Sequence, residues 1–216
     1  MGKKLVITID GPGGAGKSTV SKILAAKLAY LYLDTGAYYR AYAYKAKQEG
    51  ILPENDELLA ELGGRTIIHT ENKEGIFLVF VDGEDVTENI RKEEISILAS
   101  AISARLCVRQ ALIEIQRKFG SQGGIVAEGR DMGTVVFPDA DFKFYLDATT
   151  SERAKRRSQE LFARDADGDY EKVASALMLR DKQDSERQIA PLKPAVDAHI
   201  IDSTNMTVKD VVDKMA

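Results

Sequence analysis

A glycine-rich stretch near the start of the sequence has the residue types and the spacing of a phosphate-binding loop. Residues 11–18 read GPGGAGKS, which matches the pattern G-x-x-x-x-G-K-[ST]. In such a loop the backbone N–H groups turn toward the phosphates of ATP, the lysine reaches the β and γ phosphates, and the hydroxyl binds Mg²⁺. We therefore expect this loop to bind ATP, together with Mg²⁺ for which Ser18 is a ligand. The residues expected to bind ATP are Gly11, Pro12, Gly13, Gly14, Ala15, Gly16, Lys17, Ser18 and Thr19.

The phosphate loop (residues 11–18) alone leaves several classes of nucleotide-binding protein open. The guanine-reading pattern N-K-x-D is missing, because Asn72-Lys73 continues into Glu74-Gly75, and this disfavours a regulatory GTPase. No long apolar strand ends in an Asp-Glu pair, which disfavours a motor ATPase. A glycine-rich turn without a ligand is the remaining structural alternative.

Two arginines follow predicted strands, at places where a second phosphate would need positive charge. Arg40 comes shortly after residues 34–36, DTG, and Arg130 lies within residues 128–134, EGRDMGT. Phosphoryl transfer to another phosphate gathers many negative charges, so catalysis consists mainly of positioning and charge neutralisation. Ligands bind at the carboxyl ends of the strands in an open α/β sheet, so both arginines suit an acceptor phosphate. A surface salt bridge is the alternative for each.

Two charged helical segments carry further arginines. Arg153 and Arg157 are four residues apart on one helix face, where they suit a lid that closes over ATP. A solvated helix is the alternative. Arg180, Asp184 and Arg187 also share a face, either as an ion-pair ladder or as a group that grips a ribose.

The elements that must position these residues alternate between strands and helices. Short apolar runs predict strands at residues 5–9, 30–33, 124–127, 142–146 and 199–201. Apolar or charged helical patterns follow the phosphate loop and recur at residues 91–119 (one or two helices), 151–162 and 170–187. This alternation implies crossovers between parallel strands, so the predicted fold class is α/β with a parallel sheet.

Residues 65–86 do not fit this alternation. An apolar stretch at 66–68, a turn at 73–75, a second apolar run at 76–81 and then Asp-Gly at 82–83 form a strong hairpin signal. We expect a small antiparallel sheet that is inserted in the α/β body.

Length and composition bound these interpretations. The 216 residues suffice for one domain, and 30 basic against 34 acidic residues give a net charge of −4. This charge provides no global positive field for nucleic acid or for an anionic membrane. No apolar run exceeds six residues, and the one cysteine, Cys107, excludes an intrachain disulfide. We expect a cytoplasmic monomer that acts on small molecules and binds neither nucleic acid nor membrane.

The motifs, in their order, resemble those of bacterial cytidylate kinases, a family of nucleoside monophosphate kinases. The segments that carry the resemblance are IDGPGGAGKST, LDTGAYYR, EGRDMGTVVFPDA, RDKQDSERQIAPLKPA and IIDST, which extend over nearly the whole chain. The third segment is the most specific. The resemblance implies a P-loop kinase fold with a five-stranded parallel sheet flanked by helices, a small antiparallel insert and a helical lid.

The resemblance also divides the single domain into regions. They are a core at about 1–34, 120–150 and 188–216, a monophosphate-binding region at about 35–119 with its insert at about 65–86, and a lid at about 151–187. The hairpin read from the residues falls in the implied insert.

By position, the resemblance assigns roles to the polar residues. Together with the motif it gives, as catalytic residues, Lys17, Arg130, Arg153, Arg157 and Arg187. It places Thr35, Arg40 and Arg130 near the CMP phosphate, Ser100, Arg109 and Asp131 around cytosine, Arg180 and Asp184 at the sugar, and Arg187 between the two nucleotides. Thr35 has a helix cap as its alternative, and the spacing of Ser100 and Arg109 equally suits a helix terminus and a surface pair.

The function that follows is transfer of the γ-phosphate of ATP to CMP or dCMP, which gives ADP and CDP or dCDP. A kinase for another monophosphate, UMP or AMP, is the first alternative. The second is a P-loop protein that binds nucleotide without catalysis. Lys17 and the arginines argue against it, because a pure binder does not need charge on both sides of a transferred group.

Overall fold

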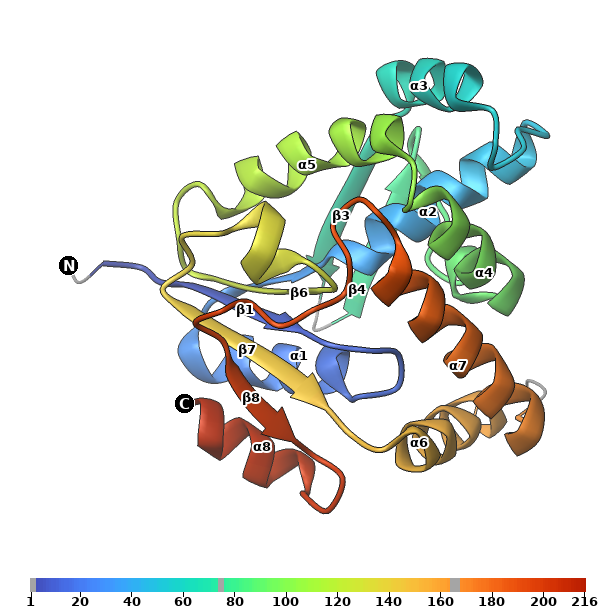
Figure 1. The fold of residues 1–216 in the computed structure, drawn as a ribbon. Coiled ribbons are helices and arrows are strands. Elements are labelled where there is room, and N and C mark those ends of the chain that lie inside the picture. Colours follow the sequence, from blue (N-terminus) through green and yellow to red (C-terminus); the bar gives the residue numbers. More distant parts are fainter. Residues whose placement is uncertain (1–2, 74–75, 164–167) are drawn as a thin grey trace. The chain divides into compact units, whose positions relative to one another are not determined.

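The chain divides into two compact units. The structure is a computed structural model that describes residues 3–73, 76–163 and 168–216. Unit 1 combines residues 1–34 with 119–216, and unit 2 is formed by residues 35–118. Figure 1 shows the elements of both units. The phosphate loop and the predicted lid belong to unit 1, and the predicted insert belongs to unit 2.

Unit 1 is built on a five-stranded parallel sheet with the strand order β2-β6-β1-β7-β8. The strands are β1 Val6–Asp10, β2 Leu31–Asp34, β6 Ile125–Gly129, β7 Phe142–Asp147 and β8 His199–Asp202. β6 is buried along its whole length, as expected for a central strand that is covered on both faces. The five predicted strands and the α/β class are confirmed.

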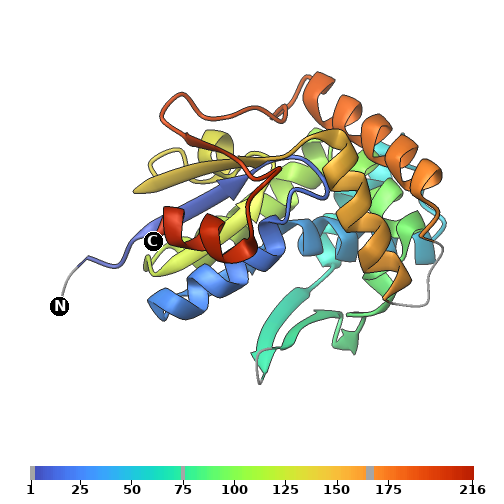
Figure 2. The same ribbon diagram turned by 90° about the horizontal axis from the view of Figure 1, so that it is seen from below.

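Helices of unit 1 flank this sheet. They are α1 Lys17–Leu28, α6 Thr150–Phe162, α7 Tyr170–Glu186, α8 Val208–Met215 and the short π-helix η2 Met132–Val136. In Figure 2, α1 and α8 lie side by side below the sheet, and Val20 and Leu24 of α1 are buried. Periodicity predicted α1, α6 and α7 but not α8, which begins with a capping box between Thr207 and Asp210.

α6 and α7 pack against each other as a helical pair. Ala154 of α6 forms a small apolar core with Val173 and Leu177 of α7. The side chain of Thr149 caps α6, and that of Asp169 caps α7. The two helices account for the predicted lid except for residues 164–167, which lie outside the described residues.

Unit 2 combines helices with a separate small sheet. Its elements are α2 Thr35–Gln48, α3 Asp56–Arg65, β3 Ile68–Lys73, β4 Ile76–Val81, β5 Glu84–Asp85, the 3-10 helix η1 Asn89–Arg91, α4 Glu93–Ile102 and α5 Leu106–Gly120. The last two residues of α5 already belong to unit 1. α2 supplies much of the core of unit 2, because Tyr38 and Tyr42 are almost completely buried.

The predicted insert is an antiparallel sheet with the strand order β3-β4-β5. Asp82 and Gly83 join β4 to β5 with φ angles of +51° and +86°, as a tight hairpin turn requires. The Asp82 carboxylate also accepts the Ile67 N–H over 2.9 Å. The hairpin is therefore confirmed, whereas the turn expected at 73–75 includes Glu74 and Gly75, which lie outside the described residues.

The long helical stretch predicted at 91–119 consists of two helices, α4 and α5. Their apolar faces are buried, with Ile95 and Ile102 on α4 and Leu112 on α5 almost inaccessible. Within the described ranges, no single helix is long and apolar enough to cross a membrane; α4 and α5 reach the required length only as a pair bent by 102°.

Candidate active site

The phosphate loop runs from the end of β1 to the start of α1, as the sequence predicted. Gly11 has a φ of +148°, and a Cβ there would lie 2.0 Å from the carbonyl oxygen of Leu146 on β7, so only glycine fits. The first turn of α1 begins at Lys17 and leaves N–H groups without intrahelical partners. Such N–H groups, together with the helix dipole, form an anion site. The residues expected to bind ATP therefore form the turn between β1 and α1 and the first positions of α1.

Lys17 is a buried lysine within the phosphate loop. Its Nζ donates to the Pro12 carbonyl oxygen over 2.7 Å, so the side chain folds back onto the loop. Burial, followed by the positive charge of Arg130, lowers the pKa of Lys17 from 10.5 to about 7. A bound phosphate would favour the charged lysine again, because an opposite charge nearby raises the pKa of an amine.

Glu128 is a site residue that the sequence interpretation missed. It lies on β6 next to β1, is buried, and accepts a hydrogen bond from the Tyr32 hydroxyl. Burial, followed by the negative charge of Asp34, raises the pKa of Glu128, although the Ser18 hydroxyl lowers it by hydrogen bonding. The sequence did contain a signal for Glu128 as a site residue, because it lies near the carboxyl end of a predicted strand and two residues before Arg130.

Ser18 and Glu128 together have the donor set that suits Mg²⁺. Both offer oxygen ligands, which this cation prefers, and a hydrogen bond links them. No group of three or more His, Cys, Asp or Glu side chains in the described part of the chain could hold a metal ion. Mg²⁺ is usually bound by one or two protein ligands, by water and by substrate phosphates.

Asp10, also missed from sequence, fixes the segment that carries Arg130 and Asp131. Its carboxylate oxygens accept the N–H groups of Met132 and Gly133, each over 2.8 Å. Burial raises the pKa of Asp10 to about 6, even though these two hydrogen bonds lower it. The two bonds tie the end of β1 to the start of η2.

Predicted substrate residues of unit 1 come together in one charge cluster, formed by Arg130, Asp131, Arg180, Asp184 and Arg187. The Nε of Arg130 donates to Asp184 over 2.9 Å, and Nη2 of Arg187 lies 3.6 Å from Asp131. Arg180 and Arg187 each place a nitrogen 3.9 Å from an oxygen of Asp184. The segment that follows β6 and the last turns of α7 therefore meet around Asp184.

Asp184 is the centre of the charge cluster, with a side chain that is only 5% exposed. Burial alone would raise its pKa, but the positive charges of Arg130, Arg180 and Arg187 outweigh burial and hold the pKa below its ordinary value. The ion-pair ladder on α7 is real, but it does not account for Arg130, which comes from another segment. The cluster contains more positive than negative groups, so it can accept an anion.

The charge cluster lies beside the phosphate loop within unit 1. Nη2 of Arg130 would be 3.7 Å from a Cβ built at Gly13. Arg130 also depresses the pKa of Lys17 through its charge. The surface salt bridge considered for Arg130 is wrong, because its partner Asp184 is buried. The structure thus brings a candidate donor site and a candidate acceptor site together.

The two lid arginines predicted as a pair have different surroundings. The side chain of Arg153 is 7% exposed, and its Nη1 donates to the carbonyl oxygen of Gly13 over 3.0 Å. Arg157 is 22% exposed and pairs with Glu160 of its own helix over 3.0 Å. The solvated-helix interpretation is therefore wrong for Arg153, which is built into the phosphate loop.

Arg156 also approaches the phosphate loop, although its spacing did not single it out. Its Nη1 donates to the Ser203 hydroxyl over 3.0 Å and, more weakly, to the Ala15 carbonyl oxygen over 3.5 Å. Its Nε pairs with Glu152 over 2.9 Å. Arg156 therefore links α6, the phosphate loop and the segment after β8.

Unit 2 carries the other predicted substrate residues. Thr35 is buried at the first position of α2, and Arg40 lies further along the same helix. Ser100 and Arg109 are both buried, so the alternative of a surface pair is wrong for them.

A short relay at the junction of α4 and α5 brings Ser100 and Arg109 together. Nη1 of Arg109 donates to the Ser103 carbonyl oxygen over 3.1 Å, and the Ser103 hydroxyl donates to the Ser100 carbonyl oxygen over 2.8 Å. The Arg109 guanidinium also lies 5.6 Å from the centre of the Tyr39 ring. The relay holds polar groups in an otherwise apolar core.

Comparison with known proteins covers almost the entire chain. The family model described as cytidylate kinase matches residues 7–216. The cytidylate kinase of Geobacter sp. (strain M21) is 49% identical over 212 residues, which cover 98% of this chain and 91% of that protein. The cytidylate kinase of Bacillus subtilis (strain 168) is 46% identical over 215 residues, which cover 100% of this chain and 96% of that protein.

A similarity of fold also extends to a solved structure. An uncharacterised protein from Eubacterium ventriosum aligns over 99% of this chain and 96% of its own, with a TM-score of 0.51 and 12% sequence identity. At this identity the likeness concerns the fold alone.

Proposed function

The chain belongs to the cytidylate kinase family, and we propose on this basis that its reaction is transfer of the γ-phosphate of ATP to CMP. The products are ADP and CDP. The observation that best supports the proposal is the charge cluster beside the phosphate loop, because it supplies positive charge for two phosphorylated substrates within one unit. The deoxynucleotide dCMP is proposed as a second acceptor.

ATP is the donor, and the phosphate loop binds its phosphates. Backbone N–H groups of residues 11 and 13–19 and the side chain of Lys17 supply the positive potential. Arg153 and Arg157 add charge from the lid, Arg153 from its buried position against Gly13. These contacts neutralise the charge that develops on the transferred group.

The residues proposed to bind CMP are grouped by the part of the nucleotide that they contact. The proposed contacts to its phosphate are Thr35, Arg40 and Arg130, those to cytosine are Ser100, Arg109 and Asp131, and those to the sugar are Arg180 and Asp184. Asp131 is buried and pairs with Arg187, and its carboxylate oxygens can accept hydrogen bonds. Cytosine has an amino group, a hydrogen-bond donor, where uracil has a carbonyl oxygen, an acceptor. The carboxylate of Asp131 would therefore favour cytosine over uracil.

Transfer itself needs little covalent chemistry from the protein. Lys17, Arg130 and Arg187 hold the two nucleotides and offset the repulsion between their phosphates. Asp10 keeps Arg130 in place through its two hydrogen bonds to the following residues. Ser18, with Glu128 next to it, would hold Mg²⁺, and when bound the ion would neutralise phosphate charge.

The regional boundaries, the cellular location and the oligomeric state are also proposals. The lid at 151–187 closes over ATP and excludes water, which would otherwise hydrolyse the donor. We keep the core and the monophosphate-binding region with the boundaries given above. The protein is proposed to be cytoplasmic, because a single cysteine suits a reducing compartment, and to be a monomer.

Competition between acceptors tests the proposed function. The purified protein is given ATP, Mg²⁺ and an equal mixture of CMP, dCMP, UMP and AMP, and the diphosphates formed are separated by chromatography. We expect CDP and dCDP to form first, with UDP slower and ADP formed from ATP alone. UMP or AMP consumed as fast as CMP would favour a kinase for another monophosphate, and no consumption of any monophosphate would favour a non-catalytic nucleotide-binding protein.

A further inference from the structure

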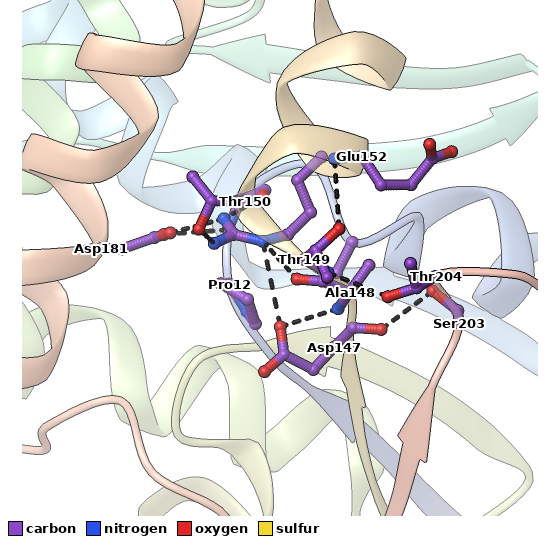
Figure 3. A network of polar contacts seen from close by, with 12 residues as sticks. Pro12, Asp147, Ala148, Thr149, Thr150, Glu152, Asp181, Ser203 and Thr204 are labelled. Carbon is purple, nitrogen blue, oxygen red and sulfur yellow. Dashed lines mark hydrogen bonds and ion pairs between the residues drawn. The ribbon is translucent and has the colours of Figure 1, made fainter.

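Asp181 of α7 contacts the phosphate loop and the lid arginine at the same time. One of its oxygens accepts the backbone N–H of Gly13 over 3.3 Å, and the other pairs with Nη1 of Arg153. Figure 3 shows the Asp181 carboxylate directed at the guanidinium group, with Thr150 and Asp147 also around it. A single carboxylate therefore lies between two groups that bind phosphate in the proposed function.

The position of Asp181 is fixed by packing. Leu177, one helical turn earlier on α7, is buried and its Cδ2 would lie 2.9 Å from a Cβ built at Gly13. On the other side of the loop, a Cβ at Gly14 would lie 2.7 Å from the carbonyl oxygen of Arg153. The lid helices are thus in close contact with the phosphate loop, and Asp181 lies at this contact.

Arg153 requires an anionic partner in this position. Its side chain is 7% exposed, and an unpaired buried charge is strongly destabilising. Nε donates to the Ala148 carbonyl oxygen over 2.9 Å and Nη2 to the Thr150 hydroxyl over 3.1 Å, both of which are neutral acceptors. Asp181 supplies the negative charge closest to this guanidinium, since Asp147 is 3.9 Å away.

We propose that Asp181 is an internal competitor of the donor phosphates: it occupies an anion position of the phosphate loop in the free protein, and the phosphates of ATP displace it. A carboxylate and a phosphate both present charged oxygen acceptors to N–H groups, so they compete for Gly13 and Arg153. Asp181 thereby weakens the binding of any polyphosphate and keeps Arg153 neutralised until a ligand arrives. This inference rests on the proposed function of the phosphate loop and of Arg153.

The test replaces Asp181 with its uncharged isostere, Asp181→Asn. The matched control, Glu171→Gln, removes one negative charge from the exposed first turn of the same helix. Calorimetry gives the dissociation constants of ATP, inorganic tripolyphosphate and adenosine for the wild type and both variants. We expect Asp181→Asn to bind ATP and tripolyphosphate about tenfold more tightly and adenosine within about twofold of the wild type. The control should stay within about twofold for all three ligands.

Unchanged or weaker tripolyphosphate binding by Asp181→Asn would overturn the proposal, because a merely structural aspartate gives no gain in affinity when it is removed. If the wild type phosphorylates CMP but the variant shows no gain, the inference fails alone. If the wild type binds neither ATP nor tripolyphosphate, the proposed function fails as well.

A measurement on the wild type keeps the test decisive if Asp181→Asn does not fold. The Asp181 side-chain carboxyl carbon and the Gly13 amide are followed by NMR while tripolyphosphate is added. Displacement predicts that both resonances shift together with the same apparent affinity. A carboxyl resonance that does not move while the Gly13 amide shifts would overturn the proposal.

Discussion

The charge cluster of unit 1 and the ion pairs on the surface of unit 2 use the same residue types in different environments. Asp184 has a side chain that is 5% exposed, and three arginines lie within 4 Å of its carboxylate. In unit 2, Arg65 pairs with Glu49, and the two side chains are 49% and 27% exposed. Both regions contain arginine–carboxylate pairs, but only one of them withdraws these charges from water.

This difference in exposure distinguishes charged residues that take part in the proposed reaction from charged residues that keep a protein surface hydrated. Burying ions costs free energy that their mutual attraction rarely recovers in full, so a buried cluster is a poor way to stabilise a fold. Exposed pairs cost little and contribute little. Buried and strongly perturbed groups around a phosphate loop are therefore the expected sign of a functional site.

The largest expected effect comes from Lys17→Ala. The lysine supplies charge to the phosphates and, with its depressed pKa, contributes no stability through its charge. We expect kcat/KM for CMP and ATP to fall about 10²- to 10³-fold while the thermal unfolding midpoint stays the same or rises slightly. Lys27→Ala, at an exposed position on the same helix, is the control. An activity within about tenfold of the wild type would refute the role of Lys17.

Asp131→Ala should have a smaller and more selective effect. Loss of the carboxylate removes an acceptor for the cytosine amino group and the partner of Arg187. We expect slower turnover of both CMP and UMP and a CMP-to-UMP preference, measured as a ratio of kcat/KM values, that narrows by about 10- to 100-fold. Equal losses on the two substrates would assign Asp131 a structural role instead.

The pH dependence of ATP binding sharpens the comparison further. In the free protein the pKa of Lys17 is about 7, so at higher pH most of the lysine is neutral, whereas bound phosphates favour its charged form. ATP binding should take up a proton, and affinity should fall by up to about tenfold per pH unit between pH 8 and 9. Calorimetry in two buffers of different ionisation enthalpy measures the proton directly. Lys17→Ala should abolish the uptake; its persistence in that variant would contradict this assignment.

The smallest effect is expected from Arg65→Ala in unit 2. The variant removes an exposed ion pair with Glu49, and such pairs contribute little to folding or to function. We expect kcat/KM within about twofold of the wild type and an unfolding midpoint that barely changes. A loss as large as that of Lys17→Ala would show that the contrast between the two regions is wrong.

Local sequence signals predicted those elements that are defined by residues next to one another in the sequence. The phosphate loop, the central strands and the hairpin ending at Asp82-Gly83 each depend on neighbouring residues, so pattern alone was sufficient. α8 was missed, although Thr207 and Asp210 formed a readable capping signal at its start. The fold class followed from the alternation of these local elements.

Parts of the site that depend on packing could not be predicted. Spacing placed Arg153 and Arg157 together, yet the packing of α6 buries the first and leaves the second paired on its own helix. Asp181 is one of many acidic residues in a charged segment, and only the packing of α7 brings it to Gly13. Sequence spacing shows which residues share a face of a helix. Which segment packs against that face depends on the rest of the fold.

The most direct test of the central claim is the stoichiometry of the complete reaction. Purified protein, ATP, Mg²⁺ and CMP are mixed, and ADP and CDP are quantified over time by ion-exchange chromatography. If the buried charges around the phosphate loop promote phosphate transfer from ATP to CMP, one CDP forms for each ADP. Almost no ADP then forms without CMP. ADP that accumulates without CDP, at the same rate whether or not CMP is present, would contradict the account and indicate a nucleotide hydrolase.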